Sequence, residues 1–213
     1  MSSTPAADSK PGAPATRIAL VLFEEVDLLD VGGPYEVLLT ANRLVERGGD
    51  PPPFDLITAS LDGKPVTAYG GLGLIPQAAT GDVRDVDVVL VPGAVAIDRA
   101  LEDGRLVGLV RAHSRAGGLV VSVCTGAFFI GAAGLLDGRP FTTHFEDLDA
   151  LAQRVPAGNP LDSVRWVDDG DLITAGGLSS GIAMALHLVE RLAGRPLAEA
   201  TARQIDYDWT EQR

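Results

Sequence analysis

The only cysteine of this 213-residue chain stands where a strand pattern changes into a helix pattern. Residues 119–123 are mainly apolar and include three β-branched valines, and Cys124 is followed by Thr125, Gly126 and a stretch rich in Ala, Phe, Leu and Gly. At such a turn the backbone is strained and the side chain projects above the carboxyl edge of the sheet. The positive end of the following helix would lower the thiol pKa from about 8.5 towards roughly 4 to 7. We predict that Cys124 is a thiolate nucleophile; the alternative is an inert buried cysteine.

A thiolate nucleophile needs a proton donor or acceptor nearby, and acidic residues follow the first predicted strand, residues 17–23. The candidates are Glu24, Glu25, Asp27 and Asp30. If this strand and the strand ending at residue 123 are neighbours in the sheet, one of these carboxyls can reach the sulfur. Two adjacent anions repel, so the carboxyl would be held protonated and could shuttle a proton. Residue types alone do not choose among the four, and each could instead belong to a solvated acidic turn.

A Pro-Gly turn after the predicted strand at residues 87–91 supplies a third element. The backbone N–H groups of Gly93 and Ala94, together with that of Thr125, could form a cradle that stabilises an oxyanion or binds substrate. A plain turn is the alternative for this segment.

The three histidines do not form a metal site by spacing. His113 lies between two arginines and is predicted at the surface, whereas His187 lies in a long apolar stretch and is predicted to pack in the core. His144 follows two threonines and could approach the cysteine. One cysteine and three scattered histidines argue against zinc, and no glycine-rich phosphate-binding loop is found. We therefore predict no metal and no cofactor.

The elements that must position these residues alternate between strand and helix patterns. Short apolar runs predict strands at 17–23, 54–59, 87–91 and 119–123. Apolar stripes predict helices at 27–47, with Pro34 near its first turn, and at 101–115, 125–136, 146–154, 178–192 and from Pro196 onward. Hairpins are predicted within 66–76 and across 164–174, and a short strand at 141–144. This alternation predicts an α/β three-layer sandwich with a mostly parallel central sheet, of the flavodoxin-like class.

Composition limits the partners and the compartment. The net charge is −12, so nucleic acid is an unfavourable ligand and a small-molecule substrate is expected. A single cysteine and the lack of a signal peptide favour the cytoplasm. Residues 116–136 are uncharged but contain five glycines, which favours a buried strand and helix over a membrane span. We expect a disordered tail over residues 1–16 and a single domain over residues 17–213.

Several segments together resemble the ThiJ/PfpI superfamily, which has the class I glutamine-amidotransferase-like fold. They are L-F-E-E-V-D-L-L-D-V-G-G-P, V-L-V-P-G, S-V-C-T-G-A-F-F-I-G-A-A-G-L-L-D-G, T-T-H-F and L-I-T-A-G-G-L-S-S-G-I-A-M-A-L. Within the superfamily the pattern is most similar to isonitrile hydratases (isocyanide hydratases), lyases with a Cys-Thr pair and an acidic residue in an L-D-x-x-G-P turn. The resemblance implies Cys124 as nucleophile, Asp30 as acid/base and Thr125 as the neighbouring hydroxyl. It also implies a homodimer, and hydration of an isonitrile to an N-substituted formamide.

The chain departs from related branches at identifiable positions. Ala94 replaces the second glycine of the family's Pro-Gly-Gly turn, and Thr125 replaces the histidine of the intracellular peptidases. Glyoxalases and deglycases usually carry Glu in place of Asp30, and related transcription regulators carry an additional DNA-binding domain that we do not expect here. The alternatives left open are a glyoxalase-like or deglycase-like enzyme acting on 2-oxoaldehydes, and a non-catalytic sensor whose Cys124 is oxidised.

Overall fold

The computed structural model describes residues 14–209. The predicted tail over residues 1–16 lies mostly outside this range, but Thr16 already belongs to the first strand, β1 (Thr16–Leu22). The last residue of the predicted tail therefore lies in a strand, and the division into a tail and a single domain stays a prediction. No helix among the described residues has both the length and the apolar character needed to cross a bilayer.

A seven-stranded sheet forms the centre of the molecule, in the order β10-β11-β7-β6-β1-β2-β5. The other six strands are β2 (Phe54–Ser60), β5 (Ala78–Ala79), β6 (Val88–Val91), β7 (Leu119–Val123), β10 (Trp166–Asp168) and β11 (Leu172–Ala175). All neighbours pair in parallel except β10 and β11, which form an antiparallel hairpin at one edge. This confirms the predicted α/β class with a mostly parallel sheet.

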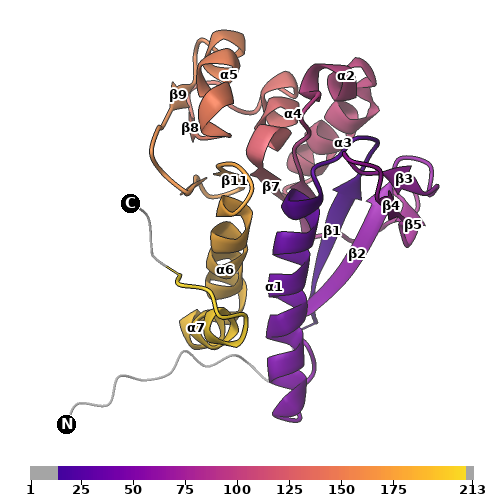
Figure 1. The fold of residues 1–213 in the computed structure, drawn as a ribbon, viewed down its shortest axis with the longest axis vertical. Coiled ribbons are helices and arrows are strands. Elements are labelled where there is room, and N and C mark those ends of the chain that lie inside the picture. The colour runs from indigo at the N-terminus through magenta and orange to yellow at the C-terminus, as the bar shows by residue number, and fades with distance from the viewer. Residues whose placement is uncertain (1–13, 210–213) are drawn as a thin grey trace.

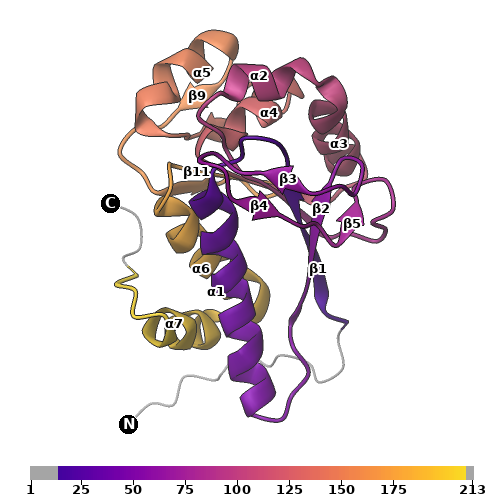
Figure 2. The same cartoon turned by 45° about the vertical axis from the view of Figure 1, so that its right-hand side comes forward.

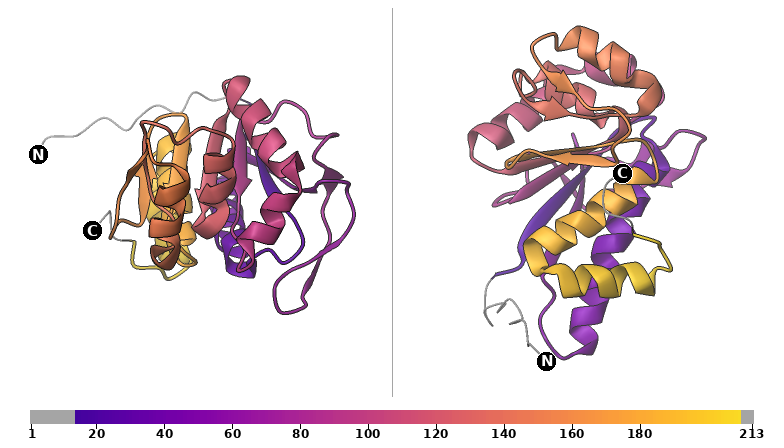
Figure 3. Two further views of the ribbon diagram at one scale, coloured as in Figure 1. Left: turned by 90° about the horizontal axis from the view of Figure 1, so that it is seen from above. Right: turned by 90° about the vertical axis from the view of Figure 1, so that its left-hand side faces the viewer.

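Helices cover both faces of the sheet and complete the three layers (Figures 1 and 3). One face carries α1 (Leu28–Arg47), α6 (Ser180–Ala193) and α7 (Arg195–Gln204). The other carries α2 (Ile97–Glu102), α3 (Gly104–Arg115), α4 (Ala127–Ala132) and α5 (Leu148–Arg154). Successive strand residues point to opposite faces, so Leu20 packs into the core under α1 and α6, and Val21 packs into the core under α3 and α4. Buried aliphatic strands explain why few aromatic residues are needed.

Three helix predictions differ from the structure. The helix predicted at 101–115 is divided into α2 and α3, because the Asp103 side chain accepts the Arg105 N–H and caps a new helix. The helix predicted at 125–136 is shorter: a 3₁₀ turn, Cys124–Gly126, precedes α4, and α4 ends at Ala132. Pro34 lies inside α1, not at its first turn.

Small elements lie outside the main sheet. The hairpin predicted within 66–76 is formed by β3 (Val66–Thr67) and β4 (Gly73–Leu74), which Figure 2 shows beside β5. The strand predicted at 141–144 is reduced to β8 (Pro140–Phe141), which pairs with β9 (Asn159–Pro160) and not with the main sheet. The segment after Phe141 is therefore free to lie near the ends of the central strands.

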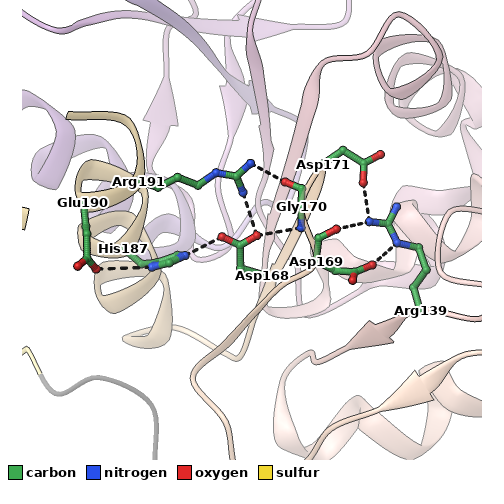
Figure 4. A network of polar contacts seen from close by, with 8 residues as sticks. All are labelled: Arg139, Asp168, Asp169, Gly170, Asp171, His187, Glu190 and Arg191. Carbon is green, nitrogen blue, oxygen red and sulfur yellow. Dashed lines mark hydrogen bonds and ion pairs between the residues drawn. The ribbon is translucent and has the colours of Figure 1, made fainter. Parts of the chain in front are cut away.

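A network of ion pairs holds the β10–β11 hairpin (Figure 4). His187 Nε2 lies 2.8 Å from Asp168 Oδ2, and Arg191 Nη1 lies 2.9 Å from Asp168 Oδ1. The His187 ring also stacks on Trp166, with 5.2 Å between ring centroids. Arg139 pairs with acidic residues of the hairpin turn from the other side. The prediction of a core-packed His187 was wrong, because its ring lies at the partly exposed edge where α6 meets this hairpin.

His113 also differs from its prediction. Its ring is half-buried and Nε2 lies 3.1 Å from the Leu119 carbonyl oxygen, so it is not a free surface residue. Burial lowers its pKa.

Candidate active site

The candidate site lies at the carboxyl ends of four central strands. In chain order the core strands follow the flavodoxin-like arrangement 2-1-3-4-5, in which the connections diverge between β1 and β6. Ligands of open parallel sheets bind outside the carboxyl ends at this switch point. The loops after β1, β6, β7 and β11 meet there. The strands ending near Phe23 and Val123 do not meet the condition of being neighbours, because β6 lies between them.

Cys124 occupies a strained turn, as predicted. Its φ is 55°, a left-handed conformation that is uncommon for a residue other than glycine. Its N–H donates to the Gly176 carbonyl (3.2 Å), and its carbonyl accepts the Thr143 hydroxyl (2.7 Å). The turn is tight because the chain approaches β6 closely: a Cβ atom on Gly126 would lie 2.3 Å from the Val91 carbonyl oxygen. Cys124 itself is only 5% exposed.

Two carboxyls accompany the sulfur, both from the start of α1. Cys124 Sγ, a carboxyl oxygen of Asp27 and a carboxyl oxygen of Asp30 all lie within 4.8 Å of one another. Asp30 is fully buried; its Oδ2 accepts the Gly93 N–H (3.0 Å), and its Oδ1 has no hydrogen-bond partner among the described residues. Two carboxyls and a thiol at this spacing could also approach a cation, so the expected lack of a metal stays a prediction.

The other two acidic candidates point elsewhere. The Glu24 carboxylate accepts the Thr67 N–H (3.0 Å), and Glu25 lines a separate cavity. The structure therefore brings two of the four carboxyls to the cysteine, and Asp30 is the more deeply buried of them. Its role as the acid/base stays a prediction.

Burial controls the protonation of the site. It raises the pKa of Asp30 from 3.8 to about 7, while the Gly93 N–H acts in the opposite direction. Burial, and secondarily the Asp30 carboxylate, also raises the Cys124 pKa to about 12. The predicted lowering of the thiol pKa was wrong: α4 has only six residues and starts beyond the 3₁₀ turn, so desolvation outweighs its dipole. A sulfur with a pKa of about 12 is protonated at neutral pH, so nucleophilic attack by Cys124 would require a base to accept its proton.

The predicted cradle residues hold the site together. The Gly93 N–H donates to Asp30, and the Ala94 N–H donates to Thr125 Oγ1 (2.9 Å). The Thr125 hydroxyl donates in return to the Ala94 carbonyl (2.8 Å). Two of the three predicted oxyanion donors, the N–H groups of Gly93 and Ala94, are therefore engaged by site side chains, and a substrate oxyanion would have to replace these partners. The third, the Thr125 N–H, acts on the Cys124 sulfur and lowers its pKa against the larger effect of burial. Their role in binding substrate stays a prediction.

Sequence reasoning missed the loop after β11. Leu178 has a φ of 48°, and its backbone N–H lowers the pKa values of both Cys124 and Asp30. A bulky residue is rarely held in this conformation, and no local sequence signal indicated it. His144 lies close to the acidic residues of the site. Burial raises the Asp27 pKa, and the charge of His144 acts in the opposite direction. The His144 ring packs on the loop after β11, where a Cβ on Gly177 would lie 2.0 Å from His144 Cδ2.

Exposed apolar side chains flank the site residues in the chain. Leu28 and Leu29 lie between Asp27 and Asp30, and their exposures are 41% and 43%. Three further exposed residues directly follow site residues: Val95, Phe145 and Leu178.

A flavodoxin-like sheet with a cysteine at a strained turn, and a buried carboxyl beside it, defines a class of α/β proteins with a cysteine–acid site. The chain belongs to the DJ-1/PfpI family, whose model matches residues 16–191. It is 34% identical over 195 residues to an isonitrile hydratase from Pseudomonas putida, covering 91% of this chain and 79% of that protein.

Other members of the family differ in their named functions. The chain is 32% identical over 203 residues to the HTH-type transcriptional regulator GbdR from Pseudomonas aeruginosa, covering 93% of this chain but only 54% of the regulator. The crystal structure of a THiJ/PfpI family protein from Pseudomonas syringae superposes with a TM-score of 0.79 at 26% identity, covering 96% of this chain and 82% of that one. Similarity to an isonitrile hydratase supports an enzyme; family membership alone does not define its reaction.

Proposed function

We propose that this protein is an isonitrile hydratase-type lyase that converts an isonitrile and water into an N-substituted formamide. The observation that carries the proposal is the Asp27–Asp30–Cys124 cluster, whose donor atoms lie within 4.8 Å of one another. An isonitrile carbon must gain both a nucleophile and a proton. A thiol with an adjacent carboxyl of near-neutral pKa can supply both.

In the first step the Cys124 sulfur bonds to the terminal isonitrile carbon. The Asp30 carboxylate accepts the thiol proton and delivers it to that same carbon. The carbon thus gains both the sulfur and the proton, and the product is a thioimidate, R–N=CH–S–Cys. The Asp30 pKa of about 7 suits both halves of this transfer. The Leu178 N–H stabilises the negative charge on sulfur or carboxylate during the transfer.

In the second step water adds to the thioimidate carbon and the C–S bond breaks. One proton of the water goes to the sulfur and the other goes to the nitrogen, and the products are R–NH–CHO and a free thiol. Asp27, whose pKa burial also raises, is a second proton carrier next to the first. No cofactor is required by this balance, in line with the prediction that none is bound.

The surroundings of the site fit a substrate with an apolar substituent. Leu28 and Leu29 lie between Asp27 and Asp30 in the chain, and Leu178 carries the backbone N–H that acts on Cys124 and Asp30; all three expose aliphatic side chains. A small-molecule substrate, a cytoplasmic location and a homodimer are retained as proposals; the homodimer rests on family resemblance and is tested by sedimentation equilibrium.

The decisive assay follows formamide production from cyclohexyl isonitrile and from a straight-chain alkyl isonitrile. Cys124→Ala and Asp30→Asn should each lower kcat by at least about 100-fold, on the scale of a lost nucleophile or general acid–base. Glu24→Gln is the matched control, because its carboxyl belongs to the same turn but faces Thr67. No turnover by the wild-type protein, or equal turnover by Cys124→Ala, refutes the proposal. Lactate formed from methylglyoxal would support the glyoxalase alternative, and peroxide oxidation of Cys124 without turnover would support a sensor.

A further inference from the structure

A cavity lies on the same edge of the sheet, separate from the cysteine site. Its volume is about 330 Å³, and it is an open cavity lined by the ends of β1 and β2, by the loop after β2, and by α2 and α3. Cys124, Asp30 and Thr125 are not among its lining residues. The volume is at the lower end of the range found for small-molecule sites.

Most of the charges that line this cavity are already satisfied. Lys64 Nζ lies 3.0 Å from Asp62 Oδ2, and Arg105 forms a bidentate pair with Asp103. Each pair is between residues close in sequence, so both remain paired without any ligand. The Glu24 carboxylate has its own partner in the Thr67 N–H.

Among the charged side chains that line the cavity, one cation and one anion are not accounted for by these contacts. Within residues 14–209 neither the Arg99 guanidinium nor the Glu25 carboxylate takes part in an ion pair or a side-chain hydrogen bond, although both residues line the cavity. A guanidinium keeps its charge at all ordinary pH values and binds carboxylates through two parallel hydrogen bonds. Opposite charges that line one small cavity and do not pair with each other are complementary to a ligand that carries both signs.

The position of Glu25 is held by its backbone. Its φ is 63°, and its N–H donates to the Thr67 carbonyl (2.8 Å) across the β3 segment. A left-handed conformation at a glutamate has a cost that surrounding structure must offset. The result is a Glu25 backbone fixed at the cavity wall, from which the side chain extends.

Apart from Ser60, the uncharged residues that line the cavity are apolar. Leu22, Phe23 and Leu106 line the cavity and belong to the sheet and to α3, where they are 2%, 7% and 2% exposed. Because they are almost fully buried, these three side chains fix the shape of the wall, whereas the partly exposed Leu61 and Ala100 of the same cavity offer aliphatic surface to a ligand. A purely ionic ligand would leave this surface unused.

We propose that this cavity binds a small zwitterion of amino-acid size with an aliphatic side chain. Arg99 binds the carboxylate, Glu25 binds the ammonium group, and the side chain packs against Leu61 and Ala100. The inference goes beyond the hydratase proposal and does not depend on it, because the two sites share none of these residues.

The test uses isothermal titration calorimetry on the full-length protein with L-leucine as the probe. Two analogues each lack one charged group: 4-methylpentanoate has no ammonium and isopentylamine has no carboxylate. L-leucine should bind at least tenfold more tightly than either analogue. In ¹H–¹⁵N spectra, its chemical-shift changes should fall on residues that line the cavity and not on Cys124.

Variants assign the two charges. Arg99→Gln and Glu25→Gln should each weaken L-leucine binding at least tenfold. Arg203→Gln and Glu46→Gln, which remove one charge each from exposed helix positions outside the cavity, should leave it unchanged. Absence of L-leucine binding to the wild-type protein, wild-type affinity in both cavity variants, or shift changes that map outside the cavity would each overturn the proposal. Circular dichroism confirms that every variant is folded before it is titrated.

Discussion

Replacing Asp30 by Asn should stabilise the protein at alkaline pH even though it removes the proposed acid/base. Asp30 is fully buried, and burial raises its pKa from 3.8 to about 7. The folded state therefore prefers the protonated carboxyl. Its contribution to stability is fully present below pH 4 and is lost as the pH rises through 7.

The size of this effect follows from the shift. At about 1.4 kcal/mol per pKa unit, a rise from 3.8 to about 7 corresponds to about 4 kcal/mol lost by the wild-type protein between pH 4 and pH 8. Asn has no charge to lose, and its oxygen can still accept the Gly93 N–H. Its NH₂ group lacks a good acceptor where Oδ1 now lies, a penalty of about 1–3 kcal/mol that does not vary with pH.

Urea denaturation of both proteins between pH 4 and pH 8 measures the difference. The stability of Asp30→Asn relative to wild type should rise with pH by up to about 4 kcal/mol across this range. Asp168→Asn provides a contrast of opposite sign. Although burial acts to raise it, the Asp168 pKa is lowered by His187, Gly170 and Arg191. Its carboxylate therefore stabilises the fold at neutral pH, and this advantage disappears as the pH falls. A stability difference between Asp30→Asn and wild type that is independent of pH would refute the reasoning.

Three further predictions concern the same site. Gly93→Ala places a Cβ 2.6 Å from Thr125 Oγ1, so urea denaturation should show a loss of about 1–3 kcal/mol, whereas Gly32→Ala, with nothing within 4 Å, should be neutral or stabilising; equal effects would contradict the packing. The buried Cys124 thiol, with its pKa of about 12, should react with iodoacetamide at pH 7 at least ~100-fold more slowly in the native than in the unfolded protein, as followed by mass spectrometry; comparable rates would show an accessible thiolate. Thr143→Val removes the hydrogen bond to the Cys124 carbonyl and should lower the free energy of unfolding by about 1 kcal/mol; unchanged stability would show that this bond does not hold the turn.

Local sequence patterns were sufficient for the architecture. Short β-branched runs ending in turn residues predicted the central strands, and a parallel arrangement brings their carboxyl ends to one edge whatever their order. The strained turn at Cys124 followed from the abrupt change from strand to Thr-Gly. These features depend on neighbouring residues and on backbone sterics, which a sequence displays directly.

The tertiary structure decided the details that depend on distant contacts. Strand order placed β6 between β1 and β7, and helix α1 then brought Asp27 and Asp30 to the sulfur while Glu24 and Glu25 turned away. The thiol pKa rises and does not fall, because burial is a property of the whole packed core. The sequence by itself determined that a cysteine would stand at the edge of a parallel sheet. Only the fold determined which groups share its proton, because solvent exclusion and the approach of remote loops set the energy of each charge there.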